Sequence, residues 1–207
     1  CHSRVTIWKD PVIEMQRTKN HGLLYKQLCK DSSASRQGMA DYIIVMRKWA
    51  DEDKWQPVTR GNERFCDYIG SSYNAPNSKD WARARSEDER KRLYSISVWQ
   101  RYASPVWFDI DQTDVLNYKL ARENNEERHI CPLQLDVIER CIELWSNTGD
   151  LVFSPFTGIG SEGVVALKMS RRFVGAELKK SYFDIACRNM QTAAKEQFDL
   201  FVAQEDV

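Results

Sequence analysis

The C-terminal third of the chain has the most regular pattern of apolar and polar residues, and this pattern begins with a helical period. Between Pro132 and Trp145 the apolar side chains return every three to four residues, a spacing typical of a helix with one buried face. These apolar positions are Leu135, Ile138, Ile142 and Trp145. Thr148, Gly149 and Asp150 form a turn sequence that predicts the end of this helix.

Two short apolar runs follow, and a helical pattern follows each of them. Residues 151–153 and 172–176 predict strands, residues 161–169 predict a helix, and a last helix is predicted from Ser181 to beyond Ala194. A strand, a helix and a second strand in this order form a βαβ unit, so we predict parallel strands joined by a right-handed crossover. The expected fold class is therefore α/β.

The N-terminal part of the chain predicts fewer and shorter elements. Residues 5–8 predict a strand that Asp10-Pro11 stops, and Asp41–Met46 predict a second, buried strand. Between them, apolar positions in Gly22–Leu28 have helical spacing, and Ser32–Gly38 predict a polar connection.

The middle of the chain has no steady period. From Trp49 to about Tyr102 charges, aromatics and turn residues alternate, which indicates an insertion or small subdomain with a helical piece within Asp80–Leu93. We therefore divide the chain into three parts. These are residues 1–48, an N-terminal part of the sheet; residues 49–103, the insertion; and residues 104–207, the βαβ lobe.

Composition excludes several classes of protein. With 207 residues, 42% of them apolar, the chain can bury one substantial core. It has no apolar run of the roughly 18 residues needed to cross a bilayer and no signal-peptide pattern, so we expect a cytoplasmic protein without membrane contact. The six cysteines form no CxxC pair and are expected to be reduced. His129 and Cys131 lack a second pair of ligands, so no zinc site is expected.

Charge is distributed unevenly although the formal net charge is zero. Residues 1–48 hold nine Lys and Arg against four Asp and Glu, whereas residues 129–207 hold eight against 11. The basic N-terminal third is either a surface that faces phosphates or a solvated helix face.

A glycine-containing turn separates the first predicted strand of the βαβ unit from its helix. Gly158 and Gly160 let the backbone turn sharply and approach a ligand, while the N–H groups of the next helix favour an anionic group. Glu177 stands at the end of the second strand, where an acid can accept both ribose hydroxyls of an adenosine. Residues 158–163 also fit the GxGxxG pattern of dinucleotide-binding proteins. We predict a nucleotide-like cofactor, the alternative being a purely structural turn with a solvated Glu177.

Three short motifs occur in order in the C-terminal third. They are HICPLQ at 129–134, SPFTGIGS at 154–161, and FVGAEL from Phe173 followed by Tyr182 and Ala186. In this order they resemble the HPTQKP, DPFxGSGT and GIELxxxYxxxA motifs of DNA methyltransferases that modify adenine N6 or cytosine N4. The resemblance covers about residues 129–190. Residues 5–48, through IWKDP and EMQRTK, also resemble a segment of phage or prophage DNA methylases.

This resemblance implies a Rossmann-like, S-adenosylmethionine-dependent methyltransferase fold with an inserted recognition region. The cofactor-binding residues that it implies are Pro132, Gln134, Ser154, Phe156, Gly158, Gly160, Ser161 and Glu177. Among them Glu177 would hold the ribose hydroxyls, and Pro132 with Gln134 would line the methionine end. Ser154 stands where the family usually has Asp, so an acidic contact near the cofactor's amino group is missing.

The catalytic motif of the resembling family is absent from the chain. That motif is a (D/N/S)PP(Y/F/W) tetrapeptide whose polar groups hold the amine and whose aromatic ring stacks on a base flipped from the duplex. The six prolines include no adjacent pair, and Lys9-Asp10-Pro11-Val12 is no substitute because Val12 cannot stack. Because the chain starts at Cys1 directly before a strand, we expect a fragment that is inactive alone. A split enzyme, completed by a homodimer or partner chain, is the alternative.

The function expected from these observations is methyl transfer to duplex DNA, to adenine N6 in preference to cytosine N4. Target recognition is expected in residues 49–103, where Trp81, Tyr94 and Trp99 fill gaps in a distorted duplex or belong to the core. Two other functions stay open. One is a catalytically silent module that binds cofactor or DNA and completes a partner chain, and the other is an NAD-dependent oxidoreductase.

Overall fold

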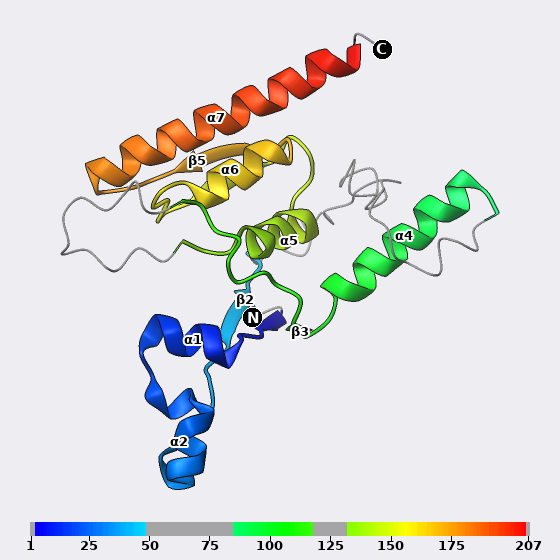
Figure 1. Ribbon diagram of the computed structural model, residues 1–207. Coiled ribbons are helices and arrows are strands. Elements are labelled where there is room, and N and C mark those ends of the chain that lie inside the picture. The colour runs from blue at the N-terminus through cyan, green and yellow to red at the C-terminus, as the bar shows by residue number, and fades with distance from the viewer. Residues whose placement is uncertain (1–2, 49–84, 118–131, 206–207) are drawn as a thin grey trace. The chain divides into compact units, whose positions relative to one another are not determined.

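The computed structural model describes residues 3–48, 85–117 and 132–205 (Figure 1). The chain divides into two compact units. The first comprises Cys1–Val58 and Gln100–Ile110, and the second comprises Thr59–Trp99 and Asp111–Val207. Across the three described ranges, no helix is both long enough and apolar enough to cross a membrane.

The first unit is built on a three-stranded sheet in the order β2-β1-β3. β1 (Ser3–Ile7) lies in the centre, antiparallel to β2 (Asp41–Val45) and parallel to β3 (Val106–Trp107). Val5 and Ile7 of β1 are buried because alternate residues of a strand point to the same face. Both predicted strands are therefore confirmed.

The prediction that β2 is a buried strand is wrong. Its side chains alternate between half-buried and exposed, and Tyr42 and Ile44 are more than half exposed. β2 lies at an edge of the sheet, where an antiparallel strand commonly has one face covered and the other in water. The apolar run alone did not reveal this, because short apolar runs do not distinguish edge from central strands.

Helix α1 (Pro11–Thr18) begins where the sequence indicated only the end of a strand. The Asp10 side chain accepts hydrogen bonds from the backbone N–H groups of Val12 and Ile13, at 2.7 and 3.2 Å. Pro11 occupies the first helical turn, where a missing N–H leaves no hydrogen bond unmade. An acidic N-cap followed by proline is a helix-start signal, and here it follows directly on the strand end.

The helical spacing over Gly22–Leu28 predicted one helix, and this prediction is wrong because the helix is interrupted. The segment contains η1 (His21–Leu23) and α2 (Tyr25–Lys30), which Leu24 separates with φ −78° and ψ 134°, an extended conformation. A further short turn, η2 (Ser32–Ala34), lies in the predicted polar connection.

The second unit contains the predicted βαβ arrangement. β4 (Leu151–Ser154) and β5 (Arg172–Gly175) are hydrogen-bonded parallel neighbours, α6 (Ser161–Lys168) connects them, and α7 (Lys180–Glu205) follows β5. Figure 1 shows α7 running alongside α6, against which it packs. The two parallel strands and both helices are confirmed.

The core of the second unit lies between α6 and the helix that precedes β4. This helix, α5 (Leu135–Trp145), confirms the predicted helical segment. Ile138 and Ile142 of α5 form a buried cluster with Val165 and Ala166 of α6. The predicted apolar face is thus confirmed at Ile138 and Ile142, and Leu135 packs half-buried against the cluster, whereas Trp145 at the end of the helix is 42% exposed.

The recognition region predicted from the sequence is described only in part. Helix α4 (Glu87–Tyr102) contains the second half of the helical piece predicted over Asp80–Leu93 and continues beyond it. Residues 49–84 lie outside the described residues, as do His129 and Cys131. Among the residues that are described, no group of three His, Cys, Asp or Glu side chains could hold a metal ion.

Arg171 joins the ends of two helices in the second unit. Arg171 is buried, with only 2% of its surface exposed. Its guanidinium donates to the Ser146 carbonyl at 3.0 Å and to the Met169 carbonyl at 2.7 Å. These carbonyls lie just past the last turns of α5 and α6, where backbone acceptors lack partners within the helix.

Replacing Arg171 by methionine is expected to destabilise the chain by about 2 kcal/mol, because two helix-end carbonyls lose charged donors. Urea unfolding followed by circular dichroism measures this change. The control is Arg172→Met, since the exposed Arg172 side chain donates to a single carbonyl, that of Gly149, at 3.0 Å. Equal losses of stability in the two variants would contradict the role given to Arg171.

The described cysteines differ sharply in their surroundings. Cys29, Cys141 and Cys187 are free thiols. Burial in α5 raises the pKa of Cys141 to about 12, so its reactive thiolate is scarce at neutral pH. Cys29 is exposed.

We expect iodoacetamide at pH 8 to label Cys29 in the folded chain while Cys141 stays unlabelled until denaturant is added. Peptide mass mapping after timed labelling measures both sites. Comparable labelling rates for Cys29 and Cys141 without denaturant would show that α5 is not packed as described.

Candidate functional site

The loop between β4 and α6 is fastened to the end of β5. The Thr157 N–H donates to the Ala176 carbonyl at 3.0 Å, and the Ala176 N–H donates to the Ser154 carbonyl at 3.0 Å. The Gly160 N–H closes a turn onto the Thr157 carbonyl at 2.9 Å. The loop therefore has a defined conformation at the carboxyl ends of two parallel strands, where α/β sheets bind ligands.

The two glycines of this loop serve different purposes. Both have positive φ values, 55° at Gly158 and 92° at Gly160. A Cβ at Gly160 would lie 3.1 Å from Cβ and 3.2 Å from Cα of Ala186 in α7, so this glycine permits close helix packing. A Cβ at Gly158 would meet nothing within 4 Å, so the backbone of Gly158 has open space on that side.

The Glu177 carboxylate lies against the glycine loop. One of its oxygens accepts the Gly158 N–H at 2.8 Å, and the other accepts the Lys179 N–H at 2.9 Å. The structure thus brings together the turn and the acid that the sequence singled out. A carboxylate offers about four acceptor positions, so two remain for other donors.

The remaining residues singled out from the sequence have contrasting environments. Ser154 at the end of β4 and Ser161 in the first turn of α6 are buried, whereas Phe156, within the loop, is 85% exposed. Gln134 is buried at the start of α5, and Pro132 is half-buried. Within the described part of the chain, neither Pro132 nor Gln134 shares a hydrogen bond with the loop.

Helix α7 holds the loop from the other side, through residues that sequence reasoning missed. The Asn189 side-chain amide donates to the Ile159 carbonyl at 2.9 Å, and Ile159 is buried with Ile185. Tyr182, Ile185, Ala186 and Asn189 recur at helical spacing on one face of α7. The positions of Tyr182 and Ala186 in the motif could therefore have pointed to Asn189.

Glu162, in the first turn of α6, is a second acidic residue and closely follows the loop in the sequence. Burial raises the pKa of Glu162 above its usual range. Because the folded state holds this proton more tightly than the unfolded chain does, Glu162 reduces stability as the pH rises through that range.

Comparison with known proteins assigns this arrangement to a family. The family model described as DNA methylase, of the N6 and N4 type, matches residues 5–188. The chain belongs to this DNA methylase family. The match includes both the N-terminal sheet and the glycine loop with Glu177.

Curated relatives of the family match parts of the chain. The Type II methyltransferase M.BglII of Bacillus subtilis is 41% identical over 109 residues, which are 45% of this chain and 30% of that protein. The Type II methyltransferase M2.DpnII of Streptococcus pneumoniae is 38% identical over 142 residues, 66% of this chain and 49% of that protein. The chain spans less than half the length of these relatives.

A solved structure supports the fold. The crystal structure of a candidate DNA modification methylase from Thermus thermophilus matches with a TM-score of 0.50 at 18% identity, and covers 93% of this chain and 56% of that one. The α/β, Rossmann-like methyltransferase fold predicted from the sequence is thus confirmed. Family membership favours a methyltransferase over the NAD-dependent oxidoreductase that the GxGxxG pattern left open.

Proposed function

We propose that the chain is the cofactor-binding and DNA-recognising part of an enzyme that methylates adenine N6, or cytosine N4, in duplex DNA. The cofactor is S-adenosylmethionine. The observation that carries the proposal is the Glu177 carboxylate, held against the Gly158 backbone at 2.8 Å at the carboxyl ends of parallel strands. Two of the solved structures that the chain matches were determined with S-adenosylmethionine.

The residues present fit an adenosyl ligand. Glu177 keeps two acceptor positions, which suits the two ribose hydroxyls, and the open side of Gly158 leaves room for a ligand close to the backbone. The exposed Phe156 ring offers an apolar surface within the loop. Ser154 has no charge to offer the amino group of the methionine part, so that contact is weaker than an aspartate would make it.

The chain's own residues bind and orient the cofactor. Glu177 and the glycine loop hold the ribose, and Pro132 with Gln134 lines the methionine end. Gly160 and Ser161 complete the turn around the ligand. When bound, S-adenosylmethionine supplies a methyl group on a positively charged sulfur.

The amine-binding tetrapeptide lies outside this sequence, in a further segment of the same protein or in a partner chain. Support comes from the prolines, none of which are adjacent, and from the relatives, which are more than twice as long as the matched part of this chain. Residues 49–103 recognise the target sequence, and residues 5–48 give the enzyme its likeness to phage or prophage methylases.

The cofactor is tested by thermal denaturation with S-adenosylhomocysteine and, separately, with NAD. A ligand at about 100 times its dissociation constant adds roughly 2.7 kcal/mol of stability, which is readily seen as a higher melting temperature. We expect stabilisation by S-adenosylhomocysteine alone. Stabilisation by NAD alone would overturn the proposal.

The reaction is tested by joining the chain to a segment that carries a (D/N/S)PP(Y/F/W) tetrapeptide from its own gene. Duplex DNA is incubated with labelled S-adenosylmethionine, and the digested nucleosides are separated by mass. We expect N6-methyladenine from the joined protein and none from the 207-residue chain. N4-methylcytosine would correct the target base, and no product would favour a silent module that completes a partner.

A further inference from the structure

We propose that the helical segment from Trp8 to Ala40, called here the basic arm, binds the phosphates of duplex DNA. The proposal rests on the proposed function, and adds a surface separate in sequence from the recognition region at 49–103. The basic arm holds α1, η1, α2 and η2 and connects the paired strands β1 and β2.

The helical elements of the basic arm are open to solvent. None of its four helical elements contains a buried residue. Tyr25 at 78% and Met39 at 79% exposure illustrate how open the segment is. A two-residue turn suffices to join antiparallel strands, so stability of the sheet does not require this long segment.

The acidic side chains of the basic arm are occupied locally. Asp10 caps α1, and Asp31 caps η2 by accepting from the backbone N–H of Ser33 at 3.0 Å and its hydroxyl at 2.6 Å. These two bonds lower the pKa of Asp31, which therefore stays ionised while it is bound. Glu14 is largely buried and pairs with Lys9 at 3.9 Å.

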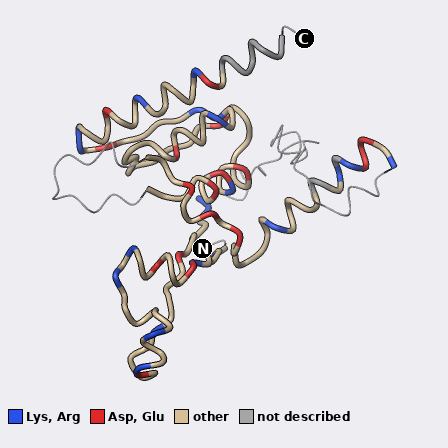
Figure 2. The backbone as a smooth tube through the Cα atoms, in the orientation of Figure 1, with Lys and Arg blue, Asp and Glu red and all other residues tan. Residues whose placement is uncertain are grey.

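The basic side chains, in contrast, are directed to solvent. Within the described residues, five exposed cations of the basic arm form no ion pair. They are Arg17, Lys19, Lys26, Lys30 and Arg36. Figure 2 shows Lys and Arg positions along the whole α1 to α2 stretch. Six Lys and Arg against three Asp and Glu leave the arm with a formal charge of +3, so the arm presents a positive surface although the chain as a whole is neutral.

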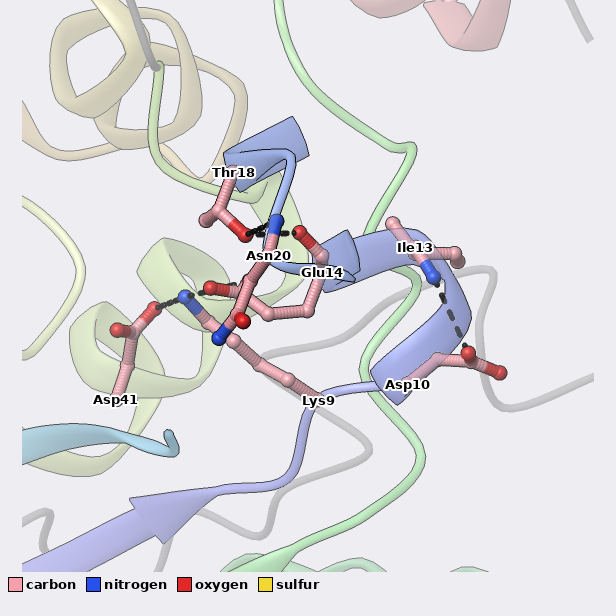
Figure 3. Close-up of polar contacts among 7 residues, drawn as sticks. All are labelled: Lys9, Asp10, Ile13, Glu14, Thr18, Asn20 and Asp41. Atoms are coloured by element: carbon pink, nitrogen blue, oxygen red, sulfur yellow. Dashed lines mark hydrogen bonds and ion pairs between the residues drawn. The ribbon is translucent and has the colours of Figure 1, made fainter. Parts of the chain in front are cut away.

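Ion pairs and a backbone hydrogen bond constrain the shape of this positive surface. Lys9 bridges Glu14 to Asp41 at the start of β2, with a distance of 2.7 Å to Asp41 (Figure 3). Farther out, the Arg36 N–H donates to the Gly22 carbonyl at 2.9 Å. A Cβ at Gly22 would lie 3.2 Å from the Arg36 side chain, so the chain segments around Gly22 and Arg36 approach closely there.

A nucleic acid duplex is the partner that this surface fits. Duplex DNA carries one negative charge per about 1.7 Å of its axis, and cations that contact phosphates release bound counterions. Phosphate contacts position a protein on the duplex without reading sequence. Such contacts require exposed, unpaired Lys and Arg on a structured support, which the basic arm supplies.

The test compares two charge-matched triple variants of the whole chain. One is Lys26→Gln, Lys30→Gln and Arg36→Gln in the basic arm. The control is Lys168→Gln, Arg188→Gln and Lys195→Gln on the exposed surface of α6 and α7. Binding of two fluorescent duplexes of unrelated sequence is measured by anisotropy between about 50 and 200 mM KCl.

We expect the basic-arm variant to bind both duplexes at least about tenfold more weakly at 0.1 M salt, with a salt slope reduced by up to about 2.7, or 0.9 for each lost contact. The control should keep the parent slope. Unchanged binding in the basic-arm variant, an equal loss in the control, or no duplex binding by the parent would overturn the proposal. Equal competition by polyglutamate of matched charge would overturn the assignment to DNA.

Two further measurements distinguish a failure of the basic-arm proposal from unfolding of the variant and from a failure of the proposed cofactor. If the melting temperature of the triple variant falls, Arg17→Gln with Lys26→Gln replaces it, and should give about two thirds of the fold-loss on a logarithmic scale. Stabilisation by S-adenosylhomocysteine should be the same in parent and variants. If S-adenosylhomocysteine stabilises neither the parent nor any variant, the proposed cofactor is refuted. The salt slopes would still decide the role of the basic arm.

Discussion

Replacing Glu177 by alanine is expected to weaken binding of S-adenosylhomocysteine by about 100-fold or more. In the proposed role of Glu177, this variant loses two hydrogen bonds from ribose hydroxyls to a carboxylate, each contributing about 1.5–3 kcal/mol. The variant also removes the acceptors of the Gly158 and Lys179 N–H groups, so the loop loses one of its attachments to the β5 end. Isothermal titration calorimetry measures the affinity directly.

Two controls distinguish the ribose contact from a general loss of charge or structure. Glu196→Ala removes an exposed acid of α7 that pairs with Lys168 at 3.4 Å, and should leave the affinity unchanged. Glu177→Gln keeps one acceptor oxygen and should fall between parent and alanine variant. If Glu177→Ala binds the ligand like the parent, the proposed role of this carboxylate is wrong.

Replacing Gly160 by alanine is expected to lower the free energy of unfolding by about 3 kcal/mol. A residue with a Cβ at φ 92° costs about 1–2 kcal/mol, and forcing a methyl group against α7 adds about 1–3 kcal/mol. The added carbon would lie 3.1 Å from the Ala186 Cβ and 3.2 Å from its Cα, and backbone cannot move aside easily. Urea denaturation measures the change.

Gly149 supplies a matched control for the backbone part of this effect. Its φ is 83°, yet a Cβ there would meet nothing within 4 Å. Gly149→Ala should therefore cost only about 1–2 kcal/mol. The excess cost at Gly160 should shrink in an Ala186→Gly background, where part of the crowding is relieved. Equal costs at Gly149 and Gly160 would mean that α7 is not packed against the loop.

The second unit could be predicted from the sequence because its local and long-range preferences agree. Helical spacing from Leu135 to Trp145 and the short apolar runs of β4 and β5 each indicate one structure. A βαβ order then permits few topologies, and the parallel pairing follows.

The first unit resisted prediction because its features depend on context. Asp10-Pro11 follows the end of a strand and also begins a helix. Only the hydrogen bonds that the Asp10 side chain accepts show that a helix starts there. Leu24 is a good helix former but is extended in the fold, because the propensity of single residues decides little in segments this short. The exposure of β2 follows from its place at the edge of the sheet, which no local pattern contains.

The candidate site divides in the same way. Gly158, Gly160 and Glu177 stand out in the sequence because a turn and a strand-end acid are local signals. Asn189 donates to the loop from α7, thirty positions from the Ile159 carbonyl that it binds, and its selection depends on how the helix packs. Long-range side-chain bonds of this kind require the assembled fold.

The double attachment of the glycine loop bears on the speed of ligand capture. Glu177 holds the loop on the β5 side and Asn189 holds it on the α7 side, before any ligand arrives. An incoming molecule then meets a cradle that is already shaped, so little ordering entropy opposes its arrival. Association should follow a single phase whose rate grows linearly with ligand concentration, without the plateau that a slow rearrangement imposes.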